Sequence, residues 1–135
     1  MLINRSREDV FAYVGDIHND TRWQAGVKAV RYEGPPGEGM RIIQVRVVLG
    51  KRVETVAVCT RFAPPQTIAF TSDSSEVTFA GSYAFASVGE RTRVTFSMEV
   101  QMDRVPRLLR GVIAGRIQRE AATSLTTLKQ VLETA

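Results

Sequence analysis

The sequence is poor in the residues that metal sites, disulfides and membrane spans require. Its 135 residues include one cysteine, Cys59, and one histidine, His18. This excludes an intrachain disulfide and a zinc site built from several cysteines or histidines. No apolar run approaches the roughly 20 residues that cross a bilayer, and the opening MLINRSREDVF lacks the apolar core of a signal peptide. We expect no metal, no cofactor, no stable membrane insertion and a cytoplasmic location.

Charge and composition narrow the class of protein further. The net charge is +4, carried by 15 arginines and 3 lysines. A basic balance can mark nucleic-acid binding, but these arginines are scattered from Arg5 to Arg119 among acidic residues, without the interleaved aromatic rings that stack on single strands. We therefore expect no nucleic-acid partner. With 44% hydrophobic residues and no repeats or linkers, residues 1–135 are predicted to form a single domain with its own core.

Two short helices are predicted near the start. Ser6 followed by Asp9 is typical of a helix N-cap with an acidic partner. Gly15 is expected to end this helix, and a second short helix is expected over Ile17–Trp23. Only Met1–Asn4 precede the capping signal, so we expect either an unusually short first strand or a trimmed start.

Alternation of apolar and polar residues predicts six further strands. They are expected over Val27–Glu33, Met40–Leu49, Arg52–Phe62, Thr67–Thr71, Glu76–Ala86 and Arg91–Met102. The turns between them contain GPPGEG, GK, APPQ, SDSS and SVGE. The last strand has one apolar row and one polar row, which indicates an antiparallel sheet with one face in water.

A long helix is predicted over Arg104–Glu133, with Asp103 as its cap and Pro106 in its first turn. Its apolar stripe is predicted to contain Leu109, Val112, Ile113, Ile117, Ala121, Leu125, Leu128 and Leu132. This helix is the only large element that can cover the apolar face of the sheet. A curved sheet around one helix leaves space between them, so we expect a ligand pocket there.

Four segments carry a resemblance to a known superfamily: INRSREDVFAYVGDIHNDTRW, RFAPPQTIAF, GSYAFASVGERTRVTFSMEV and LTTLKQVLE. The chain resembles the helix-grip superfamily, also called SRPBCC or START-like, and within it the bacterial polyketide cyclase/dehydrase type. The resemblance implies an α+β helix-grip fold, in which a curved antiparallel sheet of about six to seven strands wraps around the C-terminal helix, with two short helices after the first strand. Because this fold serves lipid carriers, receptors, cyclases and chaperone cofactors, it does not by itself define a function.

The expected pocket would lie between the sheet and the long helix. Its predicted lining is Trp23, Glu54, Val56, Val58, Phe70, Phe79, Tyr83, Phe85, Phe96, Met98, Ile113, Arg116, Ile117 and Glu120. Gly81 is expected to leave room for a ligand to approach the backbone. For the strand over residues 40–49 two inner rows remain open, one with Ile43, Val45, Val47 and Leu49, the other with Ile42, Gln44, Arg46 and Val48.

The stretch around His18 has two readings. A histidine between Asp16 and Asp20 suggests a general base or a metal ligand. However, these residues are two apart and do not share a helix face, so we expect a structural corner in which Asp16 caps the second short helix and Trp23 packs at the end of the pocket. Cys59 is expected to be a buried, inert thiol.

Arg116 and Glu120 also have two readings. Four residues apart, they can form an ordinary, partly exposed ion pair, or a polar pair that faces the pocket and orients a ligand oxygen. Gly111 and Gly115 lie opposite the predicted stripe. We expect them either to soften the helix so that it lifts to admit ligand, or to allow close contact with another subunit in a homodimer.

The leading functional hypothesis is binding of an apolar or aromatic small molecule, such as a lipid, quinone or polyketide, in the pocket. The first alternative is a metal-independent enzyme of the cyclase/dehydrase type, in which Glu54, Tyr83, Arg46 or the Arg116–Glu120 pair would move protons on a bound polyketone. The second alternative is a protein-interaction module with a pocket filled by its own aromatic side chains. The sequence does not separate these hypotheses.

Overall fold

The computed structural model describes residues 1–48, 50–72, 78–103 and 105–134. Its elements in chain order are β1 (Leu2–Ile3), α1 (Arg7–Gly15), the 3₁₀ helix η1 (Ile17–Asn19), α2 (Asp20–Trp23), β2 (Val27–Glu33), β3 (Arg41–Val48), β4 (Lys51–Ala63), β5 (Thr67–Ser72), β6 (Thr78–Val88), β7 (Arg91–Gln101) and α3 (Arg107–Thr134). The strands form one antiparallel sheet in the order β1-β7-β6-β5-β4-β3-β2. This is the predicted helix-grip fold.

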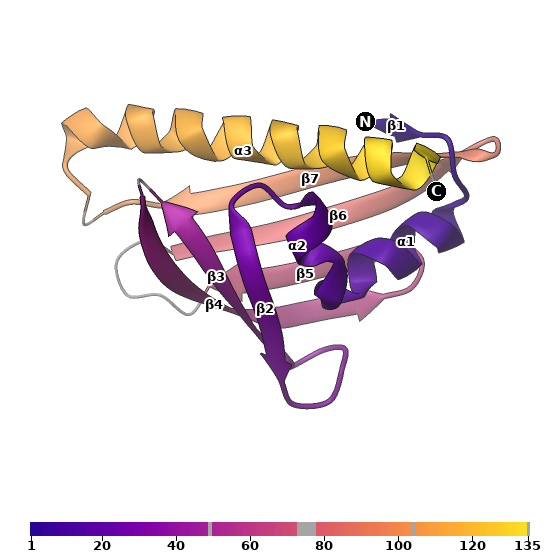
Figure 1. The fold of residues 1–135 in the computed structure, drawn as a ribbon, viewed down its shortest axis with the longest axis horizontal. Coiled ribbons are helices and arrows are strands. Elements are labelled where there is room, and N and C mark those ends of the chain that lie inside the picture. Colours follow the sequence, from indigo (N-terminus) through magenta and orange to yellow (C-terminus); the bar gives the residue numbers. More distant parts are fainter. Residues whose placement is uncertain (49, 73–77, 104, 135) are drawn as a thin grey trace.

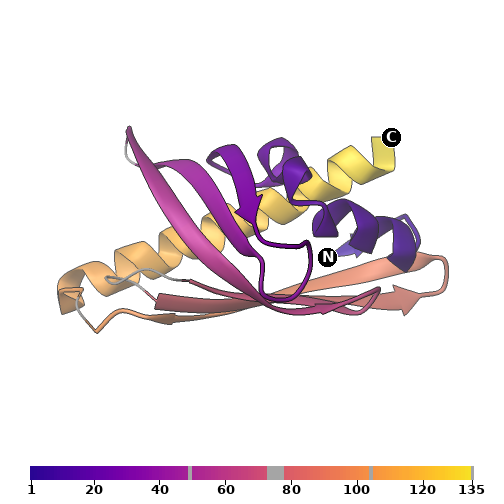
Figure 2. The same cartoon turned by 90° about the horizontal axis from the view of Figure 1, so that it is seen from below.

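The sheet is strongly curved, and the helices lie on its concave side. In Figure 1 α3 runs along β7 and β6, α2 lies between α3 and β2, and α1 lies against β6 and β7 near the chain termini. Figure 2 shows β2–β4 crossing above β5–β7, so that the sheet curls around the helices. One face of the sheet is therefore turned towards the helices.

The predicted caps at the start of the chain are confirmed. The Ser6 hydroxyl accepts a hydrogen bond from the Asp9 amide at 3.2 Å and begins α1. Asp16 Oδ1 accepts from the His18 amide at 3.2 Å and begins η1. Each carboxylate or hydroxyl satisfies an amide that has no partner within the helix, so polar side chains fix where these short helices begin.

The six predicted strands are present with small shifts at their ends. Of the predicted residues, Leu49 and the start of the Glu76–Ala86 strand lie outside the described residues. Two details of the long helix were wrong: it begins at Arg107, directly after Pro106, and Asp103 is not its cap. Instead, the Arg110 side chain donates to the Val105 carbonyl at 3.0 Å, across the turn that precedes the helix.

α3 is anchored through its second half. Its buried residues are Ser124, Leu128 and Leu132. Near the same end, Lys129 donates to the Leu2 carbonyl at 2.6 Å, and Arg5 donates to the Leu132 carbonyl at 2.9 Å. The N-terminal segment thus fastens the C-terminal half of α3 to the sheet.

The first half of α3 is covered much less. Leu109 and Val112, which were predicted to lie in its covered stripe, are 51% and 67% exposed, and Leu108 is 93% exposed. That part of the prediction was wrong, because apolar spacing was taken as evidence of contact with the sheet. Ile113 and Ile117 are half-buried. Among the described residues, no helix is both long and apolar enough to cross a bilayer.

Candidate functional site

Four aromatic rings form a continuous surface on the concave side of β5, β6 and β7. We call Phe70, Phe79, Tyr83 and Phe96 the aromatic floor. Neighbouring rings in it have centroids 4.8 to 6.5 Å apart. The strand register supports one common face, since Phe79 pairs with Val100, Gly81 with Met98 and Tyr83 with Phe96. These four residues and Met98 were predicted on the inner face, and the register confirms that face.

The aromatic floor is incompletely covered. Tyr83 is buried, whereas Phe70, Phe79, Phe96 and Met98 are only half-buried. β7 ends beneath the first turns of α3 (Figure 1), which is the half of the helix with few buried side chains. Apolar surface that stays partly exposed to water on a concave face is typical of ligand-binding sites.

Two other predicted lining residues prove to be core residues. Phe85 is 3% exposed and packs edge-to-face on Phe11 with centroids 5.3 Å apart. Trp23 is 2% exposed, and its ring lies 5.8 Å from Tyr83 at 71°. The Trp23 indole N–H is buried and has no hydrogen-bond partner in the described structure. Trp23 therefore borders the aromatic floor, while Phe85 lies deeper.

The predicted inner face of β4 was wrong. Cys59 pairs with Phe70 and Ala57 with Ser72, so Thr55, Ala57 and Cys59 face the helices. Glu54, Val56 and Val58 consequently lie on the opposite face, and the exposed Glu54 carboxylate is 3.7 Å from Arg31.

A register shift between Cys59 and Arg61 explains this error. The prediction counted back from Phe62 in steps of two. Phe62 does face inward, packing on Phe11 at 5.3 Å. An extra residue in a strand reverses the parity of everything before it, so the row that begins at Phe62 continues at Cys59 rather than at Thr60.

The open choice on β3 is resolved by its pairing with β4. Ile42 pairs with Ala57 and Gln44 with Thr55, so the row that contains Ile42, Gln44 and Arg46 faces the helices. This row brings two long polar side chains onto the concave face, beside α2.

These side chains build a hydrogen-bonded group with α2, which we call the polar cluster: Asp20, Gln24, Gln44 and Arg46. Gln44 Nε2 donates to Asp20 Oδ2 at 2.9 Å and to Gln24 Oε1 at 3.2 Å. Arg46 donates to Gln44 Oε1 at 2.7 Å and to Gln24 Oε1 at 3.2 Å. The cluster holds a guanidinium in a fixed position on the inner face.

The carboxyl group of Asp20 has an unusual environment. Asp20 is only 3% exposed. Burial raises its pKa to about 7, although the hydrogen bond from Gln44 and the charge of Arg46 act in the opposite direction. A carboxyl group with such a pKa exchanges a proton near neutral pH, as acid–base catalysts do.

Arg46 connects the polar cluster to the aromatic floor and to α3. Burial lowers the pKa of its guanidinium, and the nearby charge of Glu120 opposes that effect. Burial also raises the pKa of Tyr83, and the neighbouring Asp20 adds to this shift. Glu120 itself pairs with Arg116 at 3.2 Å, with side chains 39% and 34% exposed. The Arg116–Glu120 pair is thus partly exposed, at the border of the concave face.

The space expected at Gly81 is already occupied. A Cβ atom there would lie 2.8 Å from Cε2 and Cζ of Phe70. Gly81 therefore makes room for the Phe70 ring, and the prediction that a ligand approaches the backbone at this point was wrong.

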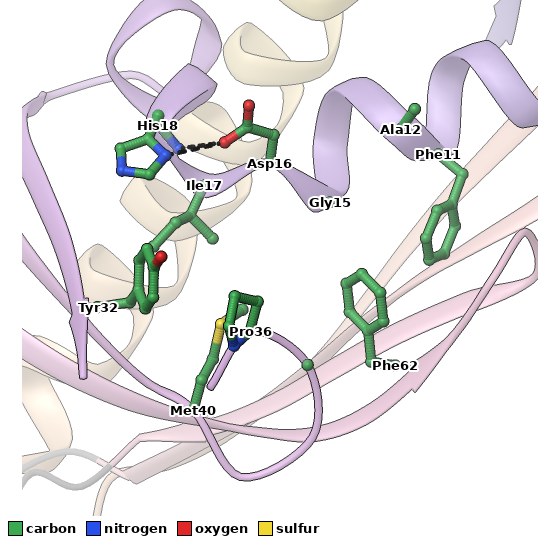
Figure 3. Close-up of a pocket in the computed structure, with 11 residues that line it drawn as sticks. Phe11, Ala12, Gly15, Asp16, Ile17, His18, Tyr32, Pro36, Met40 and Phe62 are labelled. Atoms are coloured by element: carbon green, nitrogen blue, oxygen red, sulfur yellow. Dashed lines mark hydrogen bonds and ion pairs between the residues drawn. The ribbon is translucent and has the colours of Figure 1, made fainter. Parts of the chain in front are cut away.

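A separate pocket of about 330 Å³ lies beside α1, η1 and the β2–β3 loop. Figure 3 shows Phe62, Ile17 and Met40 around its apolar part, with Tyr32 and His18 at its edge. None of the predicted lining residues belongs to it. His18 Nδ1 lies 3.0 Å from Asp16 Oδ1, and its ring packs edge-to-face on Tyr32 at 5.7 Å. These contacts fit the predicted structural corner.

Metal and thiol chemistry find no support in the described part of the chain. No group of three or more histidine, cysteine or acidic side chains is placed to hold a metal ion there. Cys59 is 1% exposed, its Sγ donates to the Arg61 carbonyl at 3.4 Å, and burial raises the pKa of its thiol. A buried, protonated thiol is inert, as predicted.

Sequence reasoning missed most of the polar cluster. Gln44 and Arg46 were considered only in one of the two possible inner rows of β3, with Arg46 also named for the enzyme hypothesis. Asp20 was considered only as a neighbour of His18, and Gln24 not at all. The available signal was Gln44 and Arg46, two polar residues two positions apart in an otherwise β-branched strand. Which row of that strand faced inward could not be read without the register.

Three comparisons place the chain among known proteins. A family model described as "Polyketide cyclase / dehydrase and lipid transport" matches residues 1–133. A search of curated proteins gives no match. Solved structures match over nearly the whole chain.

Protein TTHA0849 of Thermus thermophilus is 21% identical, with a TM-score of 0.82 over 99% of this chain and 94% of that one. The Zhui aromatase/cyclase of Streptomyces sp. R1128 is 14% identical, with a TM-score of 0.83 over 98% and 90%. A START superfamily protein of Mycobacterium smegmatis is 14% identical, with a TM-score of 0.74 over 99% and 94%. At these identities the structures establish the shared fold, and the family match establishes membership: the chain belongs to the polyketide cyclase/dehydrase and lipid transport family.

Proposed function

We propose that this protein binds an apolar or aromatic small molecule, such as a lipid, quinone or polyketide, between the sheet and the first half of α3. The observation that carries the proposal is the half-buried aromatic floor beside a polar cluster. Flat apolar rings favour an apolar or aromatic ligand. Arg46 supplies a fixed donor for a ligand oxygen, and the unpartnered Trp23 indole N–H is a second donor at the same border.

Native mass spectrometry of freshly purified protein, compared with the denatured mass, tests for a bound molecule directly. An additional mass of small-molecule size supports the proposal, and extraction then identifies the compound. No additional mass, together with no affinity for 1,4-naphthoquinone, oleic acid or naringenin by calorimetry, contradicts it and favours the interaction module.

A matched pair of variants locates the ligand. Met98→Gln places a polar group of similar size beside the aromatic floor, and Val56→Thr does the same on the opposite face of the sheet. We expect Met98→Gln to weaken binding about tenfold, the effect of about 1.4 kcal/mol of lost apolar contact, and Val56→Thr to leave it unchanged. Equal affinities would move the ligand away from the floor, for example to the pocket beside His18.

The second candidate function is a cyclase-type enzyme, and the environment of Asp20 favours it. A carboxylate with a pKa of about 7 can remove an acidic proton from a bound polyketone, while the Arg46 guanidinium stabilises the enolate oxygen that forms. Asp20→Asn removes the base and keeps the hydrogen-bond acceptor for Gln44. Loss of turnover with ligand affinity unchanged supports the enzyme; unchanged turnover excludes Asp20 as the base.

A further inference from the structure

The first six residues of α3 expose three large apolar side chains to solvent. Leu108 is 93%, Val112 67% and Leu109 51% exposed. At about 100° per residue, these three side chains span roughly 100° of the helix surface. They point away from the face that carries the buried Leu128 and Leu132. An apolar cluster on an exposed helix face is typical of a surface that binds another protein or a membrane.

The same part of the helix is strongly basic. The stretch RLLRGVIAGRIQR, residues 107–119, contains four arginines and no acidic residue. Arg107 and Arg119 are exposed. Positive charge at a helix N-terminus opposes the helix dipole, and the first turn of α3 contains no acidic residue to offset it. Arg107, in the first turn, therefore does not stabilise the helix through its dipole.

We propose that the first half of α3 docks on an anionic lipid surface, with Leu108, Leu109 and Val112 in the boundary between headgroups and acyl chains. Apolar and basic residues together on one exposed helix are typical of helices that lie on membranes without crossing them. A second copy of the chain is a poorer partner, because two such faces would bring Arg116 and Arg119 of both copies, four like charges, together. Nucleic acid would use the arginines but not the leucines.

Docking through α3 would also affect how a ligand enters the protein. β7, one of the strands that carry the aromatic floor, ends beneath this same half of the helix (Figure 1). A protein docked here would hold its least covered apolar surface close to the lipid layer, from which an apolar ligand can enter. Docking itself rests only on the outer face of α3 and does not require the proposed ligand site.

Co-sedimentation with vesicles tests the docking. We expect binding to phosphatidylcholine vesicles that contain 30% phosphatidylglycerol, no binding to phosphatidylcholine alone, and weaker binding as salt rises. Arg107→Gln with Arg119→Gln should weaken it about 30-fold, from the usual contribution of two arginines at an anionic surface. Arg91→Gln with Arg93→Gln removes the same charge from exposed positions on β7 and should change it less than fivefold.

The apolar contribution has its own variant and reporter. Leu108→Ser with Val112→Ser should weaken binding at least tenfold, and both residues are exposed, so the fold is retained. A nitrobenzoxadiazole label is attached to the cysteine of the Leu108→Cys variant, because the native Cys59 is buried and does not react. The emission of this label should shift to the blue when anionic vesicles are added. The proposal is overturned by no binding to these vesicles, by equal losses from the α3 and β7 arginine pairs, or by a dimer that Leu108→Ser with Val112→Ser dissociates. Ligand affinity without vesicles reports on the proposed function separately.

Discussion

At the scale of the residue, Asp20 is the side chain whose environment most affects the behaviour of the protein. Its carboxyl group is 3% exposed and has a pKa of about 7, against about 3.9 in an unfolded chain. The folded state therefore binds a proton that the unfolded state has lost between pH 4 and 7. Stability contributed by the neutral form is present at low pH and is lost as pH rises through 7.

Asp20→Asn removes this titration. We expect the variant to gain stability relative to the wild type as pH rises from 5 to 8, by about 2 kcal/mol, because the buried carboxylate no longer has to form. Urea unfolding of both proteins at pH 5 and pH 8 measures the difference. Parallel pH profiles would show that Asp20 is ionised at a normal pKa.

Gly81 is a second residue whose identity follows from one contact. Gly81→Ala would place a Cβ atom 2.8 Å from the Phe70 ring, so the ring must move and the aromatic floor must repack. We expect a loss of about 1–3 kcal/mol in the free energy of unfolding. In a Phe70→Leu background, which removes the ring, the same substitution should cost clearly less, and additive effects in this double-mutant cycle would contradict the contact.

At the scale of the element, α3 consists of two halves with different roles. Leu128 is fully buried, whereas Leu108 is 93% exposed. Leu128→Ala should therefore cost about 2–5 kcal/mol of folding free energy, and Leu108→Ala should stay within about 0.5 kcal/mol. Chemical denaturation of the two variants makes the comparison, and similar losses would show that the first half of the helix is packed as well.

Elements were predictable from the sequence where local chemistry defines them. The Ser6 and Asp16 caps, the end of α1 at Gly15 and the extent of β2 depend on neighbouring residues, and all four were predicted correctly. The start of α3 was not, because Pro106 fits both the first turn and the position just before it. Leu109 and Val112 were assigned to the covered face because periodicity records which residues are apolar, but not whether another element covers them.

The candidate site was predictable in part for a related reason. The rows of β6 and β7 alternate without interruption, so their inner face, including Phe79 and Met98, followed from the sequence. On β4 a single extra residue near Cys59 reverses which side chains face the helices. No local sequence pattern indicates this extra residue. The polar cluster depends on the register of β3 and on the position of α2, both of which are tertiary properties.

At the scale of the whole molecule, α3 is held firmly at its C-terminal end and is only partly buried at its N-terminal end. Lys129 and Arg5 fasten the second half of α3 to the N-terminal segment, and both termini lie at that end in Figure 1. Ile113 and Ile117, in the first half of α3, are only half-buried. Local opening is expected where few apolar contacts hold an element, so α3 should open from its first half.

A ligand that contacts both the aromatic floor and α3 would oppose this opening. At a ligand concentration 100 times the dissociation constant, binding adds about 2.7 kcal/mol to the free energy of unfolding, or roughly 10 °C in melting temperature for a chain of this size. Amide exchange around Gly111 and Gly115 should be fast without ligand and slow with it, while exchange near Leu128 changes little. Slow exchange in both states would show that the helix does not lift, and a ligand would then have to reach the floor by another route. Met98→Gln at the same ligand concentration is the control, since weaker binding should restore the fast exchange in the first half of α3 alone.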